Sequence, residues 1–346
     1  MARLCRSPIL LSLLAALAVF AISIPGAFVY DDLAVVEQDK RFGPPIDWRG
    51  LWTESYNAGV DNLYRPLVST TYALQHRIHG PTPVPFHVVN WLLHGLVSAL
   101  VAWVALRLAL RAGTDQAKSR AVALIAGVLF AVHPIHVEAV ANVVGRAELM
   151  CAAGALVAIG LSLAPLTRGR VALAFAAFLV ALLSKEQGLL VPLLVALCTI
   201  AFRTPTEGHP WASSPEQKRH RATLFALMTL GVAAMVVLRE NVLRLKFWWD
   251  RGFLDPWIQP LADVSLGERL VTSVAIAGRY LQLLTVPTTL RIDYGGPIVP
   301  GVTPMDDPYL WLGVAAIGLW IALFAFAIRR RDRALGVALI AFAILY

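Results

Sequence analysis

Charged residues and cysteines are both scarce in this sequence. Only 15% of the 346 residues are charged, against 58% that are hydrophobic, and the mean hydropathy is +0.66. A soluble domain of this size needs more charge on its surface, so this composition excludes one. The three cysteines lie in or beside apolar segments, and their spacing suggests neither a disulfide framework nor a metal knuckle. We interpret them as small buried hydrophobic residues.

The sequence also lacks internal repeats, low-complexity tracts and the basic surface of a nucleic-acid-binding protein. Its net charge is +8 and its pI about 9.7, but the lysines and arginines form short clusters between apolar runs. Such clusters are typical of the loops that set the orientation of a membrane protein. We therefore expect lipid, and no nucleic acid, as the surroundings of this chain.

What the sequence does contain is a series of apolar runs near the length of about 20 residues that crosses a bilayer. They predict an all-α, polytopic transmembrane bundle that forms one domain over residues 1–346. The last run begins near Ala334 and is cut at Tyr346, so we expect a further C-terminal part. The predicted spans are residues 8–29, 86–108, 121–133, 149–165, 171–184, 188–202, 222–238 and 309–328, with 268–286 lying along the outer interface.

The basic clusters fall on alternate connections, which we assign to the cytoplasm. The outer face then holds residues 30–85, 133–148 and 184–188. The first of these is a long loop, whose Trp48, Trp52, Tyr56 and Tyr64 we expect at the level of the lipid headgroups. Within it, residues 66–78 predict a short helix on the membrane, ended by Gly80 and Pro81.

An acidic pair, Asp31 and Asp32, directly follows the first span. One interpretation is a hydrophilic stop that only fixes the end of the helix. The other makes one of the two carboxylates a general base that takes a proton from an acceptor hydroxyl.

A second polar segment runs from His133 to Glu148 at the outer ends of two spans. Pro134 suits the first turn of a helix, on which Glu138, Asn142 and Arg146 would form one polar stripe facing a cavity. His133 and His136 are candidate metal ligands, but helix capping is favoured because no third ligand has a suitable spacing. For Arg146 the structural alternative is an ion pair with Glu148 or Glu138.

A third polar segment is the hairpin Ser184–Gly188, which places Lys185 on the outer side, against the charge rule. Its partner is either the neighbouring Glu186 or a phosphate. Arg65 and Asp293 add a cation and a carboxylate to the same face. Cations, carboxylates and aromatic rings together suit a lipid-linked phosphosugar.

Five stretches of this sequence resemble the transmembrane and tetratricopeptide-repeat O-mannosyltransferases. They are FVYDD (28–32), YRPL (64–67), FHVVNWLLH (86–94), LFAVHPIHVEAVANVVGRAEL (129–149) and LLSKEQG (182–188), with a weaker match in YLQLLTVPTTLRIDY (280–294). The combination is highly specific, whereas each piece alone is weak. One departure is that no tetratricopeptide repeats are present.

The resemblance implies a GT-C type glycosyltransferase that moves mannose from a polyprenyl-phosphate donor to a Ser or Thr hydroxyl of an exported protein, with inversion. It implies Asp31 as the base, with Asp32 second, and brings Arg146, Lys185 and Arg65 to the donor phosphate. A phosphate leaving group departs without protonation, so a single carboxylate base and charge stabilisation suffice and no second acid is required. We expect no metal or other cofactor.

The alanine-rich composition and short loops favour a bacterial relative in an inner membrane, with its active site facing the periplasm or the outside. Two rival functions stay open. A transporter or flippase of lipid-linked sugars would use the same cations, but usually binds near the bilayer midplane. A noncatalytic scaffold would tolerate Asp31→Asn and Asp32→Asn.

Overall fold

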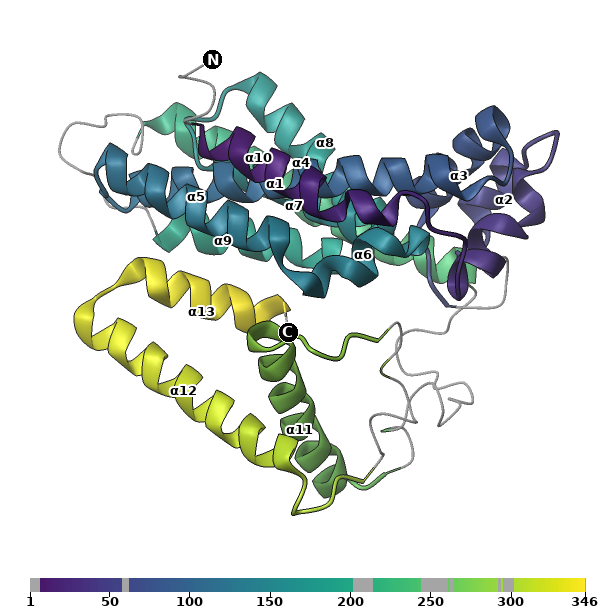
Figure 1. Cartoon of the computed structure of the whole chain (residues 1–346). Coiled ribbons are helices and arrows are strands. Elements are labelled where there is room, and N and C mark those ends of the chain that lie inside the picture. The colour runs from purple at the N-terminus through teal and green to yellow at the C-terminus, as the bar shows by residue number, and fades with distance from the viewer. Residues whose placement is uncertain are drawn as a thin grey trace. The chain divides into compact units, whose positions relative to one another are not determined.

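The structure is a computed structural model that describes residues 7–57, 62–201, 214–243, 261, 264–291, 294 and 302–345. The chain divides into two compact units, residues 1–244 with 340–346, and residues 245–339. All regular structure in the described residues is helical (Figure 1), which confirms the all-α class. The GT-C type of bundle stays a prediction.

The helices follow the predicted runs closely. In the first unit they are α1 (Pro8–Phe20), α2 (Trp48–Thr53), α3 (Pro66–His79), α4 (Pro83–Arg111), α5 (Gln116–Val132), α6 (Val137–Ala141), α7 (Arg146–Ser162), α8 (Arg168–Ser184), α9 (Val191–Ala201) and α10 (Pro215–Leu243). The second unit contains α11 (Leu266–Thr285) and α12 (Pro308–Arg330), and α13 (Arg333–Leu345) runs across the boundary between the units.

Four helical stretches are long and apolar enough to cross a membrane: α4, residues Val143–Ser162, α10 and α12. A fifth arises if α5 and Pro134–Ala141, which are bent by 50°, form one span. The first predicted span is shorter than expected, because α1 ends at Phe20 and a 3₁₀ turn, Pro25 and Gly26 follow. The membrane assignment is confirmed by these helices, whereas the orientation stays a prediction.

Small residues let the helices of the first unit approach closely. Gly127 of α5 lies against Ser12 of α1 and Ala102 of α4, so that a side chain there would overlap both. Gly160 of α7 leaves room for the ring of Trp103 of α4. Packing through small residues is the usual way for helices to associate in lipid, where the hydrophobic effect does not drive them together.

In the second unit α11 packs against α12, with Gly278 and Gly313 at the contact. Ser265 and Glu268 form a capping box at the start of α11. The helix coincides with the predicted segment 268–286, and its position along the outer interface stays a prediction.

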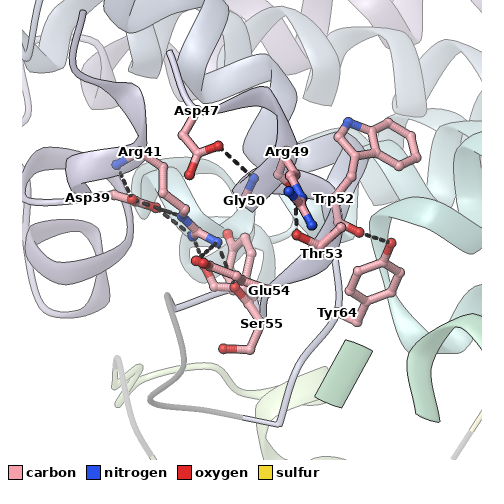
Figure 2. A network of polar contacts seen from close by, with 11 residues as sticks. Asp39, Arg41, Asp47, Arg49, Gly50, Trp52, Thr53, Glu54, Ser55 and Tyr64 are labelled. Atoms are coloured by element: carbon pink, nitrogen blue, oxygen red, sulfur yellow. Dashed lines mark hydrogen bonds and ion pairs between the residues drawn. The ribbon is translucent and has the colours of Figure 1, made fainter. Parts of the chain in front are cut away.

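The first loop is built around one buried ion pair. The guanidinium of Arg41 donates to the carboxylate of Asp39 from Nε, at 3.0 and 3.1 Å, and from Nη2, at 2.6 Å. It also donates to the carbonyl oxygen of Ser55 at 2.9 Å (Figure 2) and to that of Tyr56 at 2.8 Å. These hydrogen bonds join residues 39–41 to each other or to residues 55 and 56, and Arg41 Nη1 also lies 3.8 Å from Glu54 Oε2. Arg41 therefore closes the loop on itself.

The four aromatic residues of this loop do not share one environment, which corrects the sequence-based expectation. Tyr56 and Tyr64 are only 4% and 1% exposed, while Trp48 and Trp52 are 46% and 38% exposed. The tyrosines are buried because their hydroxyl groups have protein partners, such as the carbonyl of Trp52 at 2.9 Å from Tyr64 Oη. The helix predicted over 66–78 is confirmed as α3, and it ends at Gly80, whose φ of 66° favours glycine.

Arg41→Ala should unfold or loosen the first loop, because it leaves the Asp39 carboxylate buried without its counter-charge. Breaking a buried pair in this way costs about 3–5 kcal/mol. The measurements are the melting temperature in detergent and the rate of limited proteolysis within residues 39–56. Arg49→Ala is the matched control, since Arg49 lies in the same loop and is exposed. Equal proteolysis of the two variants would contradict the role of Arg41.

Candidate functional site

The two adjacent carboxylates after α1 have different environments. Asp31 is exposed, whereas Asp32 is fully buried. The Asp32 carboxylate accepts hydrogen bonds from the backbone N–H groups of Val144 at 2.8 Å, Val143 at 3.1 Å and Val29 at 3.3 Å. Burial raises the pKa of Asp32, and the three N–H donors partly offset this shift. Asp32 therefore ties the start of the first loop to the segment that precedes α7.

That segment is broken where the sequence predicted one continuous helix. The chain is extended at Asn142, with φ −87° and ψ 125°, and continues as a 3₁₀ turn over Val143–Gly145. The predicted stripe of Glu138, Asn142 and Arg146 on one helix is therefore wrong. The N–H groups of Val143 and Val144 bond to Asp32 instead of to the preceding turn. This tertiary contact outweighs the local helical pattern.

Arg146 begins α7 and is completely buried. Its guanidinium donates to Asn90 Oδ1 at 3.0 Å, Thr71 Oγ1 at 3.1 Å and the carbonyl of Phe86 at 3.1 Å. It also lies 4.6 Å from the ring centre of Tyr72. The structural alternative, an ion pair with Glu148 or Glu138, is not formed: in the described residues, neutral acceptors and aromatic rings surround this cation.

Two buried tyrosines connect this region with a pair of cations. Tyr72 Oη donates to the carbonyl of Val143 at 3.0 Å, and Tyr56 Oη donates to Tyr72 Oη at 3.3 Å. The guanidinium of Arg65 then lies over the ring of Tyr56, 5.1 Å from its centre. A continuous series of contacts thus runs from Asp32 to Arg65.

The turn after α8 supplies the last members of this polar cluster. Arg65 Nη2 lies 2.9 Å from Glu186 Oε2, and Lys185 forms an ion pair with Glu148. Of the two partners that the sequence left open for Lys185, the neighbouring Glu186 forms its ion pair with Arg65, although its charge still acts on Lys185. Burial, followed by the charge of Arg65, lowers the pKa of Lys185 to about 8. Glu138 also acts electrostatically on Lys185.

The structure therefore gathers most of the predicted site residues, although not all of them. Asp32, Arg146 and the two ion pairs belong to one connected cluster, with Asp31 next to it in the chain.

The predicted histidines lie outside this cluster. His133 caps the turn after α5, where its Nδ1 accepts from Ile135 N at 3.2 Å, as expected. His136 packs on Phe130 instead, with 4.1 Å between ring centres. Asp293 lies outside the described residues.

A metal site is not formed by the part of the chain that the structure describes. Within it, no three His, Cys, Asp or Glu residues lie together in a way that could hold an ion.

Sequence reasoning did not single out the polar face of α4 that supports the cluster. His87, Asn90 and His94 are spaced by three and four residues, and all three are 0% exposed. Asn90 donates to the carbonyls of Asn142 and Val143, at 3.0 and 3.1 Å, and accepts from Arg146. Three polar residues at helical spacing inside an apolar run were the available signal.

Comparison with known proteins finds relatives along most of the chain. It is 28% identical over 334 residues to protein O-mannosyl-transferase TMTC2 of Homo sapiens, covering 90% of this chain and 37% of that protein. With protein O-mannosyl-transferase TMTC4 of Mus musculus the identity is 28% over 345 residues, covering 88% of this chain and 45% of that protein. A stretch of 136 residues, 37% of this chain, is 38% identical to protein O-mannosyl-transferase TMTC1 of Homo sapiens and covers 14% of it.

The chain thus spans less than half the length of these relatives. No family model matches it, and no solved structure does so significantly. The predicted resemblance is confirmed as a similarity to protein O-mannosyl-transferases, and a bacterial origin stays a prediction.

Asp32→Ala should destabilise the protein, because it leaves the buried N–H groups of Val143 and Val144 without an acceptor. The expected loss is about 1–3 kcal/mol, measured as a lower melting temperature in detergent. Asp31→Ala is the matched control, since it removes an exposed carboxylate one residue away. If Asp31→Ala lowers the melting temperature as much, the two carboxylates do not differ as described.

Proposed function

We propose that this chain is the membrane part of a protein O-mannosyltransferase, which moves mannose from a polyprenyl-phosphate donor to a Ser or Thr hydroxyl of an exported protein. One observation carries the proposal. Residues 31–32, 65, 146–148 and 185–186 are far apart in the sequence and meet at one end of the helices, beside α3. These are the segments that carry the resemblance, and the relatives named above are O-mannosyl-transferases.

The donor phosphate is best assigned to Arg65 and Lys185. Their side chains are 13% and 16% exposed, and their partners Glu186 and Glu148 are more exposed, at 31% and 47%. A phosphate that arrives from solution can compete with these carboxylates for cations that are already held in place. Both cations are thereby desolvated in part and kept near one another before the donor binds.

Arg146 receives a different role from the one that its sequence motif implied. It is 0% exposed, and all its nitrogen atoms have protein partners. We assign it to positioning: it holds α3 and α4 against the start of α7 and so fixes the surroundings of Asp32.

The exposed Asp31 is the better candidate for the base. Its carboxylate would take the proton of the acceptor hydroxyl while the hydroxyl oxygen attacks the anomeric carbon. The bond between that carbon and the phosphate oxygen breaks, and the polyprenyl phosphate leaves with the electron pair, which inverts the anomeric centre. Asp32 is unsuited to this step, because its oxygen atoms already accept three backbone hydrogen bonds.

The arrangement favours an enzyme over the two rival functions. The polar cluster lies where helices end and the first loop begins, whereas transporters usually bind their substrates near the bilayer midplane on broken helices. A scaffold would have no need of partly exposed cations next to an exposed carboxylate. The deciding experiment is transfer of radiolabelled mannose from dolichyl or undecaprenyl phosphomannose to Ser- and Thr-containing peptides, with the full-length protein purified in detergent. No transfer with either donor would leave the proposal without support.

Asp31→Asn should abolish most transfer while the protein still folds. The amide keeps the shape of the carboxylate but cannot take a proton, so the rate should fall by about 10²–10⁴-fold. Glu37→Gln is the matched control, because Glu37 is an exposed carboxylate of the same loop. Full activity of Asp31→Asn, with an unchanged melting temperature, would exclude Asp31 as the base.

The pH dependence should report on Lys185. Because the pKa of Lys185 is lowered to about 8, this residue loses its charge as the pH rises through that value. We expect kcat/KM for the donor to fall above pH about 8, and Lys185→Arg, which stays charged, to shift that fall to higher pH. Lys118→Arg, at an exposed position away from the cluster, should leave the profile unchanged. An identical profile for Lys185→Arg would return Lys185 to a purely structural role.

A further inference from the structure

The turn between α7 and α8 lies at the end of α4 away from α2 and α3 (Figure 1). A side chain of α10 holds this turn. Gln217 accepts a hydrogen bond from Leu166 N through Oε1 and donates one to the Leu166 carbonyl through Nε2, both at 2.8 Å. Gln217 is only 9% exposed. This two-sided contact fixes the start of α10 against the turn.

The end of α4 is fixed against the same region by Trp103. Its ring occupies the space that Gly160 leaves open near the end of α7. One turn further along α4, the guanidinium of Arg107 stacks on Trp103, 4.7 Å from the ring centre. Arg107 is therefore directed toward the end of α7 and the turn that follows.

These contacts gather four arginines from three helices around one turn. Arg107 and Arg111 come from α4, Arg170 from α8, and Arg221 from α10, one turn after Gln217. The charge of Arg107 acts on Arg170, and that of Arg111 on Arg107 and Arg221. Each of the four is partly buried, and Arg170 Nη1 donates to the Pro165 carbonyl at 2.6 Å.

The role of orienting the chain in the membrane does not account for this arrangement. Basic residues that set orientation act from water and need not lie together. The other cations near these helix ends fit that role, since Lys118, Arg168, Lys218 and Arg219 are all exposed. Like charges that share a partly buried site repel one another, so the gathering of the arginines has an energetic cost that a bound anion would offset.

Two further features indicate which kind of anion these arginines suit. In the described part of the chain, neither Arg107 nor Arg170 forms an ion pair with a carboxylate. All four sheltered cations are arginines, whose planar guanidinium group binds phosphate through two parallel hydrogen bonds, while both lysines are exposed. The position at the end of membrane-spanning helices suits a phospholipid headgroup.

We propose that Arg107, Arg111, Arg170 and Arg221 form a binding site for a phosphate anion, carried by an anionic lipid, at the end of the bundle away from the first loop. This site is separate from the polar cluster of Asp32 and Arg146, which lies beside α3. An anionic lipid bound here joins α4, α8 and α10, and so stabilises the bundle without taking part in mannose transfer.

The test measures lipid binding by the whole chain in a neutral detergent. Phosphatidylglycerol is titrated into the protein, and bound lipids are counted by native mass spectrometry while the melting temperature is recorded. Phosphatidylcholine serves as the zwitterionic lipid, and inorganic phosphate as the soluble anion. The double variant Arg107→Gln with Arg170→Gln is compared with Arg168→Gln with Arg219→Gln, which also removes two positive charges but from exposed positions.

We expect phosphatidylglycerol, and not phosphatidylcholine, to bind and to raise the melting temperature of the wild type and of the exposed-site variant. In the Arg107/Arg170 variant its affinity should fall by about tenfold or more, because charge-assisted contacts are lost. If inorganic phosphate stabilises the wild type as well and loses its effect in the same variant, the phosphate site stands and its ligand is a soluble phosphate.

Equal phosphatidylglycerol affinity of the two double variants would overturn the proposal, as would the absence of binding of either anion to the wild type. Should the glutamine variant fail to fold, Arg107→Lys with Arg170→Lys keeps both charges but removes the paired hydrogen bonds. That variant should bind phosphatidylglycerol more weakly than the wild type does, and an unchanged affinity for this lipid would equally overturn the proposal.

Discussion

The hydrogen bonds from Val143 and Val144 to the buried carboxylate of Asp32 are the contact on which the arrangement of the polar cluster beside α3 depends. They span 111 and 112 positions in the sequence and join the first loop to the start of the seventh helix. By accepting two backbone N–H groups, Asp32 takes them away from a continuous helix, so the chain turns at Asn142 and α7 starts at Arg146. Asn90 and Tyr72 support the same break, because they donate to the carbonyl groups of Asn142 and Val143. These tertiary hydrogen bonds together fix where α7 begins and where its first side chain lies.

Arg146 shows how a cation can be buried in such a protein without a counter-charge beside it. Asn90, Thr71 and the Phe86 carbonyl satisfy its donors, and the ring of Tyr72 lies against its face. Because Tyr72 also donates to Val143, the same ring joins the cation to the segment that Asp32 holds. The polar groups of this cluster therefore support one another, and the paired cations Arg65 and Lys185 are left at its more accessible side.

The sequence was sufficient to predict most of the helices and to single out most of the residues that the structure brings together in the polar cluster, but it did not predict which of them contact one another. Long apolar runs predicted α4, α10 and α12, and the Pro66 and Gly80 signals bounded α3, because length and local turn chemistry are properties of neighbouring residues. The break in the helix at Asn142 was not predicted, since it depends on hydrogen bonds to Asp32, more than 100 positions earlier in the sequence. For the same reason spacing could not predict the pairing of Arg65 with Glu186, 121 positions later, or that of Lys185 with Glu148. The burial of Tyr56 and Tyr64 was not predicted either, because the sequence near a membrane does not distinguish an aromatic residue that contacts lipid from one that packs inside the protein.

The hydrogen bonds from Arg41 to Asp39, Ser55 and Tyr56 bear on the order in which parts of the protein fold. The partners of Arg41 lie at most 15 positions away, so this part of the loop can close as soon as it has emerged, with little entropy lost in bringing distant segments together. Asp32 must wait for residues 143 and 144, and Arg65 for residue 186, which are synthesised later. The contacts of Arg41 can therefore form before the polar cluster of Asp32, Arg146 and Arg65 does, and we expect the later helices to dock onto this part of the loop during biosynthesis.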